Sequence, residues 1–272
     1  MTVGTYKSSV DPGLAASEQL SPEGIELQRK ITALQDLKSK LADQELELAT
    51  VRGELVAFQR HYLERVGPLY ARLDELTARI ARLRYRRRPR DEAAQRAVEE
   101  AEAQAEQSAQ AVDELQPSQS GGKFEPSETL GKAYRAAARK LHPDLTMDEA
   151  EKARRKRVMS ELNQAYEDCD EARIRRILDD WRVSPDQVQG EDTAAELVRV
   201  IRTIAMVERR LATIRDEIEA LHQSDLYQLK AQVDDAAEAG RDLLAEMAKQ
   251  LKHRIRDAAQ TLESLGEEEA VG

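Results

Sequence analysis

Residues 124–144 read FEPSETLGKAYRAAARKLHPD, and they predict one amphipathic helix that stops at a proline. Ser127 offers a side-chain oxygen to the free N–H groups at the start of this helix. At 100° per residue, the apolar side chains fall on one face and the cationic side chains on the opposite face. Pro143 lacks an N–H group and biases His142 away from helical geometry, so the helix ends there and displays Asp144 on a loop.

Two further short helices are predicted after this loop. The first begins near Asp148, and its apolar stripe consists of Met159, Leu162, Tyr166 and Cys169. It should form a short antiparallel pair with the helix before the loop, which then lies at the tip of the pair. The second offers a cover for that pair through Ile174, Ile177, Leu178 and Trp181.

Residues 124–182, about a fifth of the chain, resemble the J domain of DnaJ-like co-chaperones. The resemblance rests on three segments, Lys132-Ala-Tyr134-Arg135, His142-Pro143-Asp144 and Leu162-Asn163-Gln-Ala165-Tyr166. It implies that the chain engages a DnaK-type heat-shock chaperone and stimulates its ATPase. Because the ATPase site belongs to that partner, the chain itself is expected not to be an enzyme.

The residues expected to bind the chaperone lie in the loop and on the cationic face. They are His142, Pro143, Asp144, Lys132, Arg135, Arg139 and Lys140. The loop carboxylate can pair with a cation of the partner, while the cationic face steers the chain toward an acidic surface. The loop is expected to be exposed, so substitutions in it should change contact with the chaperone and not stability. Acid–base catalysis is disfavoured, because no Ser or Cys nucleophile, second carboxylate or pocket is readable beside the loop.

The sequence departs from the J-domain pattern ahead of the cationic helix. The family has a short first helix rich in Tyr and Leu there, whereas Phe124 is the only large apolar residue between Leu115 and Leu130. Tyr134 and Leu141 therefore need cover from another segment. No Gly/Phe-rich segment follows, and a single cysteine excludes a Cys-rich zinc module, so client binding would use the rest of the chain.

A long N-terminal coiled coil is predicted over residues 21–115. Fifteen apolar residues from Leu27 to Leu83 recur mostly at alternating steps of three and four, which keeps them on one helix stripe. A stutter at Gly67-Pro68 should bend this helix. After an arginine-rich turn around Pro89, an Ala- and Glu-rich helix should fold back beside the first. The arginines can also touch nucleic acid or lipid headgroups, but an intramolecular ion-pair strip is the favoured interpretation.

A second coiled-coil region is predicted over residues 192–266, with one helix to about Leu221 and another from Ser224 onward through Gly240. A helical hairpin and a continued coil are both compatible with the pattern. The N-terminal stripe needs a cover, which is either a second copy of the chain or these C-terminal helices. A homodimer through the coiled coils is the favoured alternative.

Composition supports an all-α class, in which long coiled-coil helices flank the J-domain-like module. Ala, Glu, Lys, Leu and Arg make up about half of the chain, whereas aromatic residues are 4% and charged residues 35%. A net charge of -10 makes nucleic acid an unlikely partner. One cysteine, no apolar run that fits a signal peptide or membrane span, and scattered histidines predict a cytoplasmic chain without metal or cofactor.

The predicted division of the chain has seven parts. They are a flexible tail at 1–20, N-terminal coiled-coil helices at 21–115, a linker at 116–123, a J domain at 124–182, a linker at 183–191, C-terminal coiled-coil helices at 192–266 and a tail at 267–272. The coiled coils would target or oligomerise the co-chaperone, through a client or targeting partner that the sequence does not name. The alternative function is a structural coiled-coil scaffold with a non-stimulating J-like module.

Overall fold

A computed structural model describes residues 21–113, 124–182 and 193–271. These residues form eight α-helices and one turn of 3-10 helix, with no strand among them, which confirms the predicted all-α class. The predicted tail at 1–20 and both predicted linkers lie outside the described residues.

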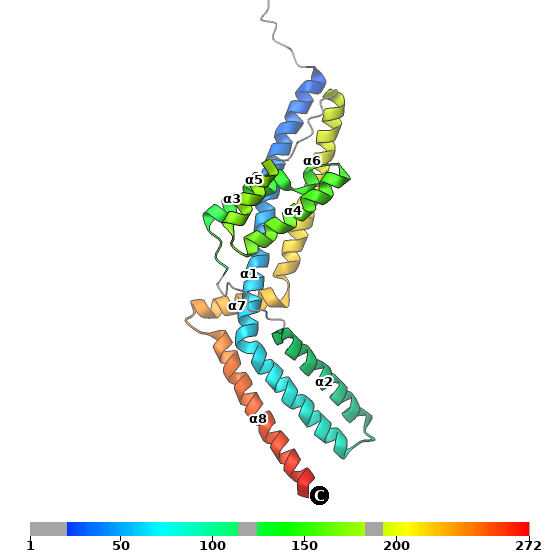
Figure 1. The fold of residues 1–272 in the computed structure, drawn as a ribbon, viewed down its shortest axis with the longest axis vertical. Coiled ribbons are helices and arrows are strands. Elements are labelled where there is room, and N and C mark those ends of the chain that lie inside the picture. The colour runs from blue at the N-terminus through cyan, green and yellow to red at the C-terminus, as the bar shows by residue number, and fades with distance from the viewer. Residues whose placement is uncertain (1–20, 114–123, 183–192, 272) are drawn as a thin grey trace, which may run out of the picture.

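The longest helix, α1 (Pro22–Arg87), forms the spine of the molecule (Figure 1). The Ser21 hydroxyl accepts a hydrogen bond from the Gly24 N–H at 3.2 Å, so the cap lies where the sequence predicts it. Pro68 lies inside the helix, and Figure 1 shows α1 changing direction near the level of α7, as the predicted stutter requires. Helix α2 (Glu92–Asp113) folds back beside α1, and Arg82 pairs with Glu102 between them.

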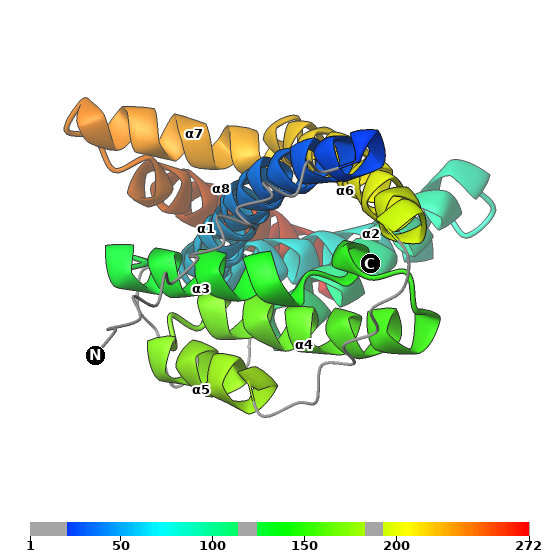
Figure 2. The same ribbon diagram turned by 90° about the horizontal axis from the view of Figure 1, so that it is seen from above.

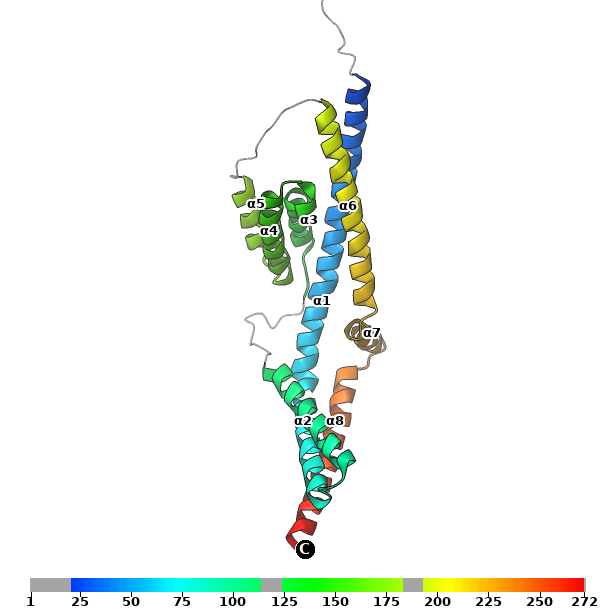
Figure 3. The ribbon, with the colours of Figure 1, turned by 90° about the vertical axis from the view of Figure 1, so that its right-hand side faces the viewer.

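Three C-terminal helices pack along the same spine, namely α6 (Thr193–His222), α7 (Asp225–Glu238) and α8 (Leu243–Val271). Figures 1 and 3 show α6 beside the N-terminal half of α1 and α8 beside its C-terminal half. One apolar cluster joins α1 to α6 through Leu34, Leu41, Leu48, Val207, Leu211, Ile214 and Ile218. A second joins α1 to α8 through Val66, Leu73, Leu244 and Leu251. The C-terminal helices thus bury the apolar stripe of α1 within one chain. Burial of this stripe does not need a second copy of the chain, and the homodimer stays a prediction.

Two C-terminal boundaries differ from the predicted ones. The helix that starts after Ser224 does not run through Gly240, because this glycine adopts a φ of 73° and the Arg241 N–H bonds to the Ala236 carbonyl. Asp242 then caps α8 by accepting a hydrogen bond from the Ala245 N–H at 2.9 Å. Helix α8 continues to Val271, into the segment predicted as a C-terminal tail.

Residues 124–182 form a small helical module, which consists of α3 (Glu128–Leu141), η1 (Pro143–Leu145), α4 (Glu149–Glu167) and α5 (Glu171–Arg182). The Leu130 N–H donates to Ser127 and the Glu151 N–H donates to Asp148, which caps both longer helices. The buried core residues of these elements are Leu130, Tyr134, Ala137, Ala138, Leu141, Met159, Leu162, Ala165, Tyr166 and Ile174. Figure 2 shows α3 and α4 between α1 and the outermost helix α5. Cys169 lies exposed in the turn after α4, at a φ of 54°, and not on the apolar stripe.

Helix α1 supplies the cover that the module lacks in its own sequence. Ala42 and Ala49 of α1 belong to the buried core of the module, and Leu46 packs against it. The hydroxyl of Thr50 lies 3.0 Å from that of Tyr166 and forms a hydrogen bond with it. One face of α1 therefore covers the apolar side of the helix pair formed by residues 128–167.

Gly53 lets the segment before α3 approach α1 closely. A Cβ atom at this position would lie 2.6 Å from the ring of Phe124, well inside van der Waals contact. The same ring packs edge-on against Tyr166, with 5.8 Å between the ring centroids. Gly53 therefore has a packing reason in the middle of a helix, where glycine otherwise costs about 1 kcal/mol relative to alanine.

Candidate functional site

The cationic face of α3 lies on the outside of the module. The side chains of Lys132, Arg139 and Lys140 are exposed, and Lys132 pairs with Glu128 one turn earlier at 2.7 Å. Arg135 is the exception, because it is half-buried and its Nε lies 3.7 Å from the carboxylate of Asp43 on α1. The cationic strip exists as predicted, with one of its members turned toward the spine.

The loop after α3 begins with a buried histidine. His142 is only 2% exposed, and its Nε2 lies 2.8 Å from Oε1 of Glu45 on α1. Its Nδ1 accepts a hydrogen bond from the Asp144 N–H at 3.1 Å, so the single ring proton belongs on Nε2 and is donated to Glu45. The expectation of an exposed loop is therefore wrong for His142, because α1 passes directly beneath it.

Glu45 joins the loop to two long helices. The same Oε1 atom accepts a hydrogen bond from Nε of Arg210 on α6 at 2.8 Å, and Arg210 also pairs with Glu217 at 2.7 Å. Arg52 of α1 completes the row with a hydrogen bond to Glu217 at 2.7 Å. Burial raises the pKa of the Glu45 carboxyl, but the hydrogen bonds from His142 and Arg210 outweigh it and bring that pKa below its ordinary value of 4.5. Glu45 is thus a buried anion held between an imidazole and a guanidinium.

The rest of the loop is partly accessible. Pro143 and Asp144 are half-buried, and the Asp144 carboxylate keeps 21% of its side-chain surface exposed. Its Oδ2 atom lies 3.9 Å from Nδ1 of His142, which is too far for a hydrogen bond. Leu145 turns inward and packs against the apolar cluster shared by α1 and α6. His142 and Leu145 therefore anchor the loop, and the carboxylate of Asp144 between them stays partly exposed.

Glu45 and Arg210 were not predicted as partners of the loop. Glu45 does leave a signal, since it follows Leu41 by four residues and precedes Leu48 by three. It thus occupies a position of the apolar stripe, where a charged residue usually has a specific buried partner. No comparable signal marks Arg210, which lies one residue before Leu211 on the edge of the stripe of its own helix.

No protein-family model, curated protein or solved structure matches this chain. The function of the chain therefore has to be argued from its own residues and contacts. The candidate residues for contact with a partner are those of the cationic face of α3 and the carboxylate of Asp144.

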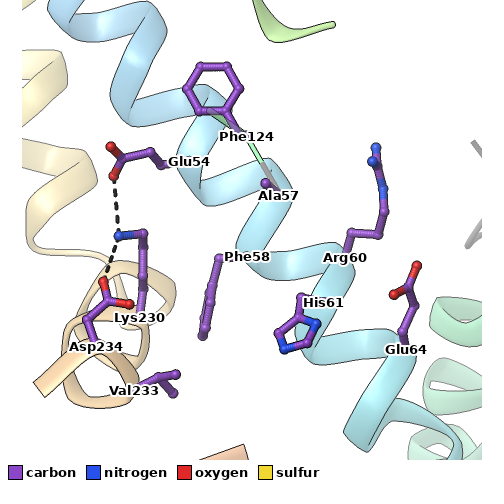
Figure 4. Close-up of a pocket in the computed structure, with 10 residues that line it drawn as sticks. All are labelled: Glu54, Ala57, Phe58, Arg60, His61, Glu64, Phe124, Lys230, Val233 and Asp234. Atoms are coloured by element: carbon purple, nitrogen blue, oxygen red, sulfur yellow. Dashed lines mark hydrogen bonds and ion pairs between the residues drawn. The ribbon is translucent and has the colours of Figure 1, made fainter. Parts of the chain in front are cut away.

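A separate cavity of about 550 Å³ lies where α1 meets α7 and the segment before α3 (Figure 4). On its charged wall, Lys230 pairs with Glu54 at 3.3 Å and with Asp234 at 2.8 Å. Phe58 and Phe124 provide its apolar wall. No residue of the loop lines this cavity, so it does not belong to the site around His142.

The described residues contain no group of three or more His, Cys, Asp or Glu side chains placed to hold a metal ion. Within the same ranges, no helix combines the length and the apolar character needed to cross a membrane.

Proposed function

We propose that residues 124–182, completed by α1, act as a J domain that binds a DnaK-type heat-shock chaperone and stimulates its ATPase. The observation that carries this proposal is the position of His142-Pro143-Asp144 at the junction of a packed helix pair whose first helix turns a cationic face to solvent. The long helices outside the module would target the co-chaperone to a client or a cell structure.

A stable helix pair is the first requirement of this function. The sequence ahead of α3 lacks the large apolar residues of the family's short first helix, so it cannot shield the core of the module from water by itself. Packing of Ala42, Leu46 and Ala49 against that core removes this difficulty, since it buries the apolar faces of α3 and α4 together. The departure from the J-domain pattern is therefore compatible with a working module.

The chemistry asked of the module is recognition. The Asp144 carboxylate can accept charge-assisted hydrogen bonds from an arginine or lysine of the partner. Lys132, Arg139 and Lys140 would raise the rate of encounter with an acidic surface. ATP hydrolysis takes place in the partner, so the chain needs no nucleophile or general base of its own.

A structural scaffold with a non-stimulating module is the second candidate. It is favoured by the burial of His142 and by the half-buried state of Pro143 and Asp144, which restrict access to the loop. A scaffold uses these contacts only to hold α1, α3 and α6 together. The two candidates differ in whether stimulation of a chaperone ATPase depends on Asp144.

Asp144→Asn should abolish stimulation of the chaperone without weakening the fold. Asparagine keeps the size of the side chain and the backbone N–H that bonds to His142, and a carboxylate that is 21% exposed and has no hydrogen bond to the described residues contributes less than about 0.5 kcal/mol to stability. The measurement is single-turnover ATP hydrolysis by a purified DnaK-type chaperone, with urea unfolding of both chains.

His142→Gln is the contrasting variant in the same experiment. It should lower the free energy of unfolding by about 1–3 kcal/mol, because the buried N–H group that bonds to Glu45 is lost. Full stimulation by Asp144→Asn would reject the role of the loop. If neither the wild-type chain nor any of its variants accelerates ATP hydrolysis, the scaffold is favoured.

Charge reversal on the outer face of α3 should weaken chaperone binding. Three exposed charge pairs at 0.2–1 kcal/mol each predict a loss of about tenfold in affinity for the triple variant Lys132→Glu, Arg139→Glu and Lys140→Glu. Arg135 is left unchanged, because its contact with Asp43 would confound binding with packing. The affinity of the wild-type chain should also fall as salt concentration rises.

The matched control reverses three exposed cations of α8, namely Lys249, Lys252 and Arg256. It changes the net charge of the chain by the same amount at a distant surface. Equal losses in the two triple variants, or binding that ignores ionic strength, would show that net charge or apolar contact governs the association.

A further inference from the structure

Helix α6 closes over the loop that the proposed function requires to be open. It lies against both α1 and η1, so the loop is held between two long helices. Leu145 packs against the apolar cluster to which α6 contributes Val207 and Leu211. On the polar side, Arg210 of α6 shares Oε1 of Glu45 with His142. The closed loop therefore has an apolar contact and a charged contact with α6.

The two covering helices differ in how they are joined to the module. Helix α1 contributes Ala42 and Ala49 to the core of the module and bonds to Tyr166 through Thr50, so it cannot leave without exposing that core. The buried residues of α6 instead face α1, and this helix meets the module mainly at η1. Helix α6 is therefore the cover that can move while the module stays folded.

The N-terminal part of α6 is the more weakly packed part. None of residues 193–202 is buried, and the apolar side chains of Val198 and Ile201 are 46% and 44% exposed. The buried face begins only at Thr203 and continues with Val207 and Leu211. A segment with few apolar contacts has a low local stability. We therefore expect α6 to separate from α1 first at residues 193–202.

We infer that α6 is a removable cover that keeps the His-Pro-Asp loop in a closed state, and that docking of the chaperone requires α6 to leave the loop. The inference rests on the proposed function and adds its regulation. A protein partner has to surround the Asp144 carboxylate to desolvate it, but that carboxylate is only 21% exposed while α6 lies against η1. The apparent affinity is then reduced by the fraction of molecules in which the cover is open.

The test opens the cover without touching the module. Val207→Asp combined with Leu211→Asp places two carboxylates in the apolar contact of α6 with α1, where they lack partners. If the cover is open in about one molecule in ten, the opened chain should reach half-maximal stimulation of the chaperone at about tenfold lower concentration than the wild type. Amide hydrogen exchange should show α6 unprotected while α3 and α4 stay protected.

The matched control is Leu244→Asp combined with Leu251→Asp, which introduces the same charge into the contact of α8 with α1. It should leave the half-maximal concentration at the wild-type value. Arg210→Gln is a milder opening variant that removes the ion pair with Glu45 and keeps the apolar contacts. If the double variant loses protection in α3 and α4, Arg210→Gln replaces it as the test of the cover. The half-maximal concentration of Arg210→Gln should be about threefold lower than that of the wild type.

The outcomes separate the inference from the proposed function. Stimulation by the wild type and by the opened chain at the same concentration overturns the cover and leaves the co-chaperone function standing. An equal gain in the α8 control also overturns the cover, because general loosening would then be the cause. No acceleration by the wild type, the double variant or Arg210→Gln overturns the proposed function together with its regulation.

Discussion

Tyr134→Ala should lower the free energy of unfolding by about 3–5 kcal/mol, the range for deleting a large buried aromatic side chain. Tyr134 is 0% exposed, and the centroid of its ring lies 4.9 Å from that of the Tyr166 ring. Its hydroxyl donates a hydrogen bond of 2.7 Å to Asn163 of α4 and lies 3.4 Å from the Glu45 carbonyl of α1. One side chain thus joins three helices, and urea unfolding followed by circular dichroism measures its contribution.

Tyr134→Phe and Lys132→Ala are the controls for this experiment. The first removes only the hydroxyl and should cost about 1–2 kcal/mol, since Asn163 loses its donor. The second truncates an exposed residue of the same helix and should change stability by less than about 0.5 kcal/mol. A loss of under 1 kcal/mol in Tyr134→Ala would contradict the packing of the module against α1.

Glu45→Ala should destabilise the chain by about 3 kcal/mol, the lower end of the range for removing one partner of a buried ion pair. The lower end applies because Arg210 keeps 24% of its side-chain surface exposed and so recovers part of its hydration. The N–H group of His142, by contrast, loses its acceptor in a buried place. Glu47→Ala, at an exposed position of the same helix, is the control and should have little effect.

The contribution of Glu45 should also depend on pH in one direction. Its pKa is lower in the folded chain than the ordinary value of 4.5, so the folded state binds the proton less tightly than the unfolded state. The stabilisation is therefore complete at neutral pH and is lost as the pH falls below 4.5 and through the folded pKa. The stability gap between wild type and Glu45→Gln should shrink over that acid range. If the difference in stability between wild type and Glu45→Gln widened on acidification, the pKa of Glu45 would be raised in the folded chain and not lowered.

Helix positions and their starts follow from local chemistry. Ser21, Ser127 and Asp148 cap helices where a small polar residue precedes an amphipathic run, and the structure shows each hydrogen bond. Such signals depend on a few neighbouring residues, so the sequence alone predicts them. The break at Gly240 was missed because Ala236 before it and Leu243 after it continue the apolar period.

The surroundings of the loop could not be predicted in the same way. Pro143 fixes where α3 ends, but the burial of His142 depends on Glu45, which lies 97 residues earlier in the chain. The apolar stripe of α1 predicts that something covers it and does not choose between a second copy and the C-terminal helices. In the structure the C-terminal helices cover this stripe, and that packing places Arg210 beside the loop.

Hydrogen exchange of this chain in the presence of a DnaK-type chaperone and ATP shows whether the module docks on the chaperone. We expect slower exchange in residues 128–145, which include the cationic face and the loop, together with faster exchange in α6 as the cover leaves. The variant Asp144→Asn should show neither change. Protection confined to α2 and α8, or no protection anywhere at saturating chaperone, would contradict the assignment of a J domain to this module.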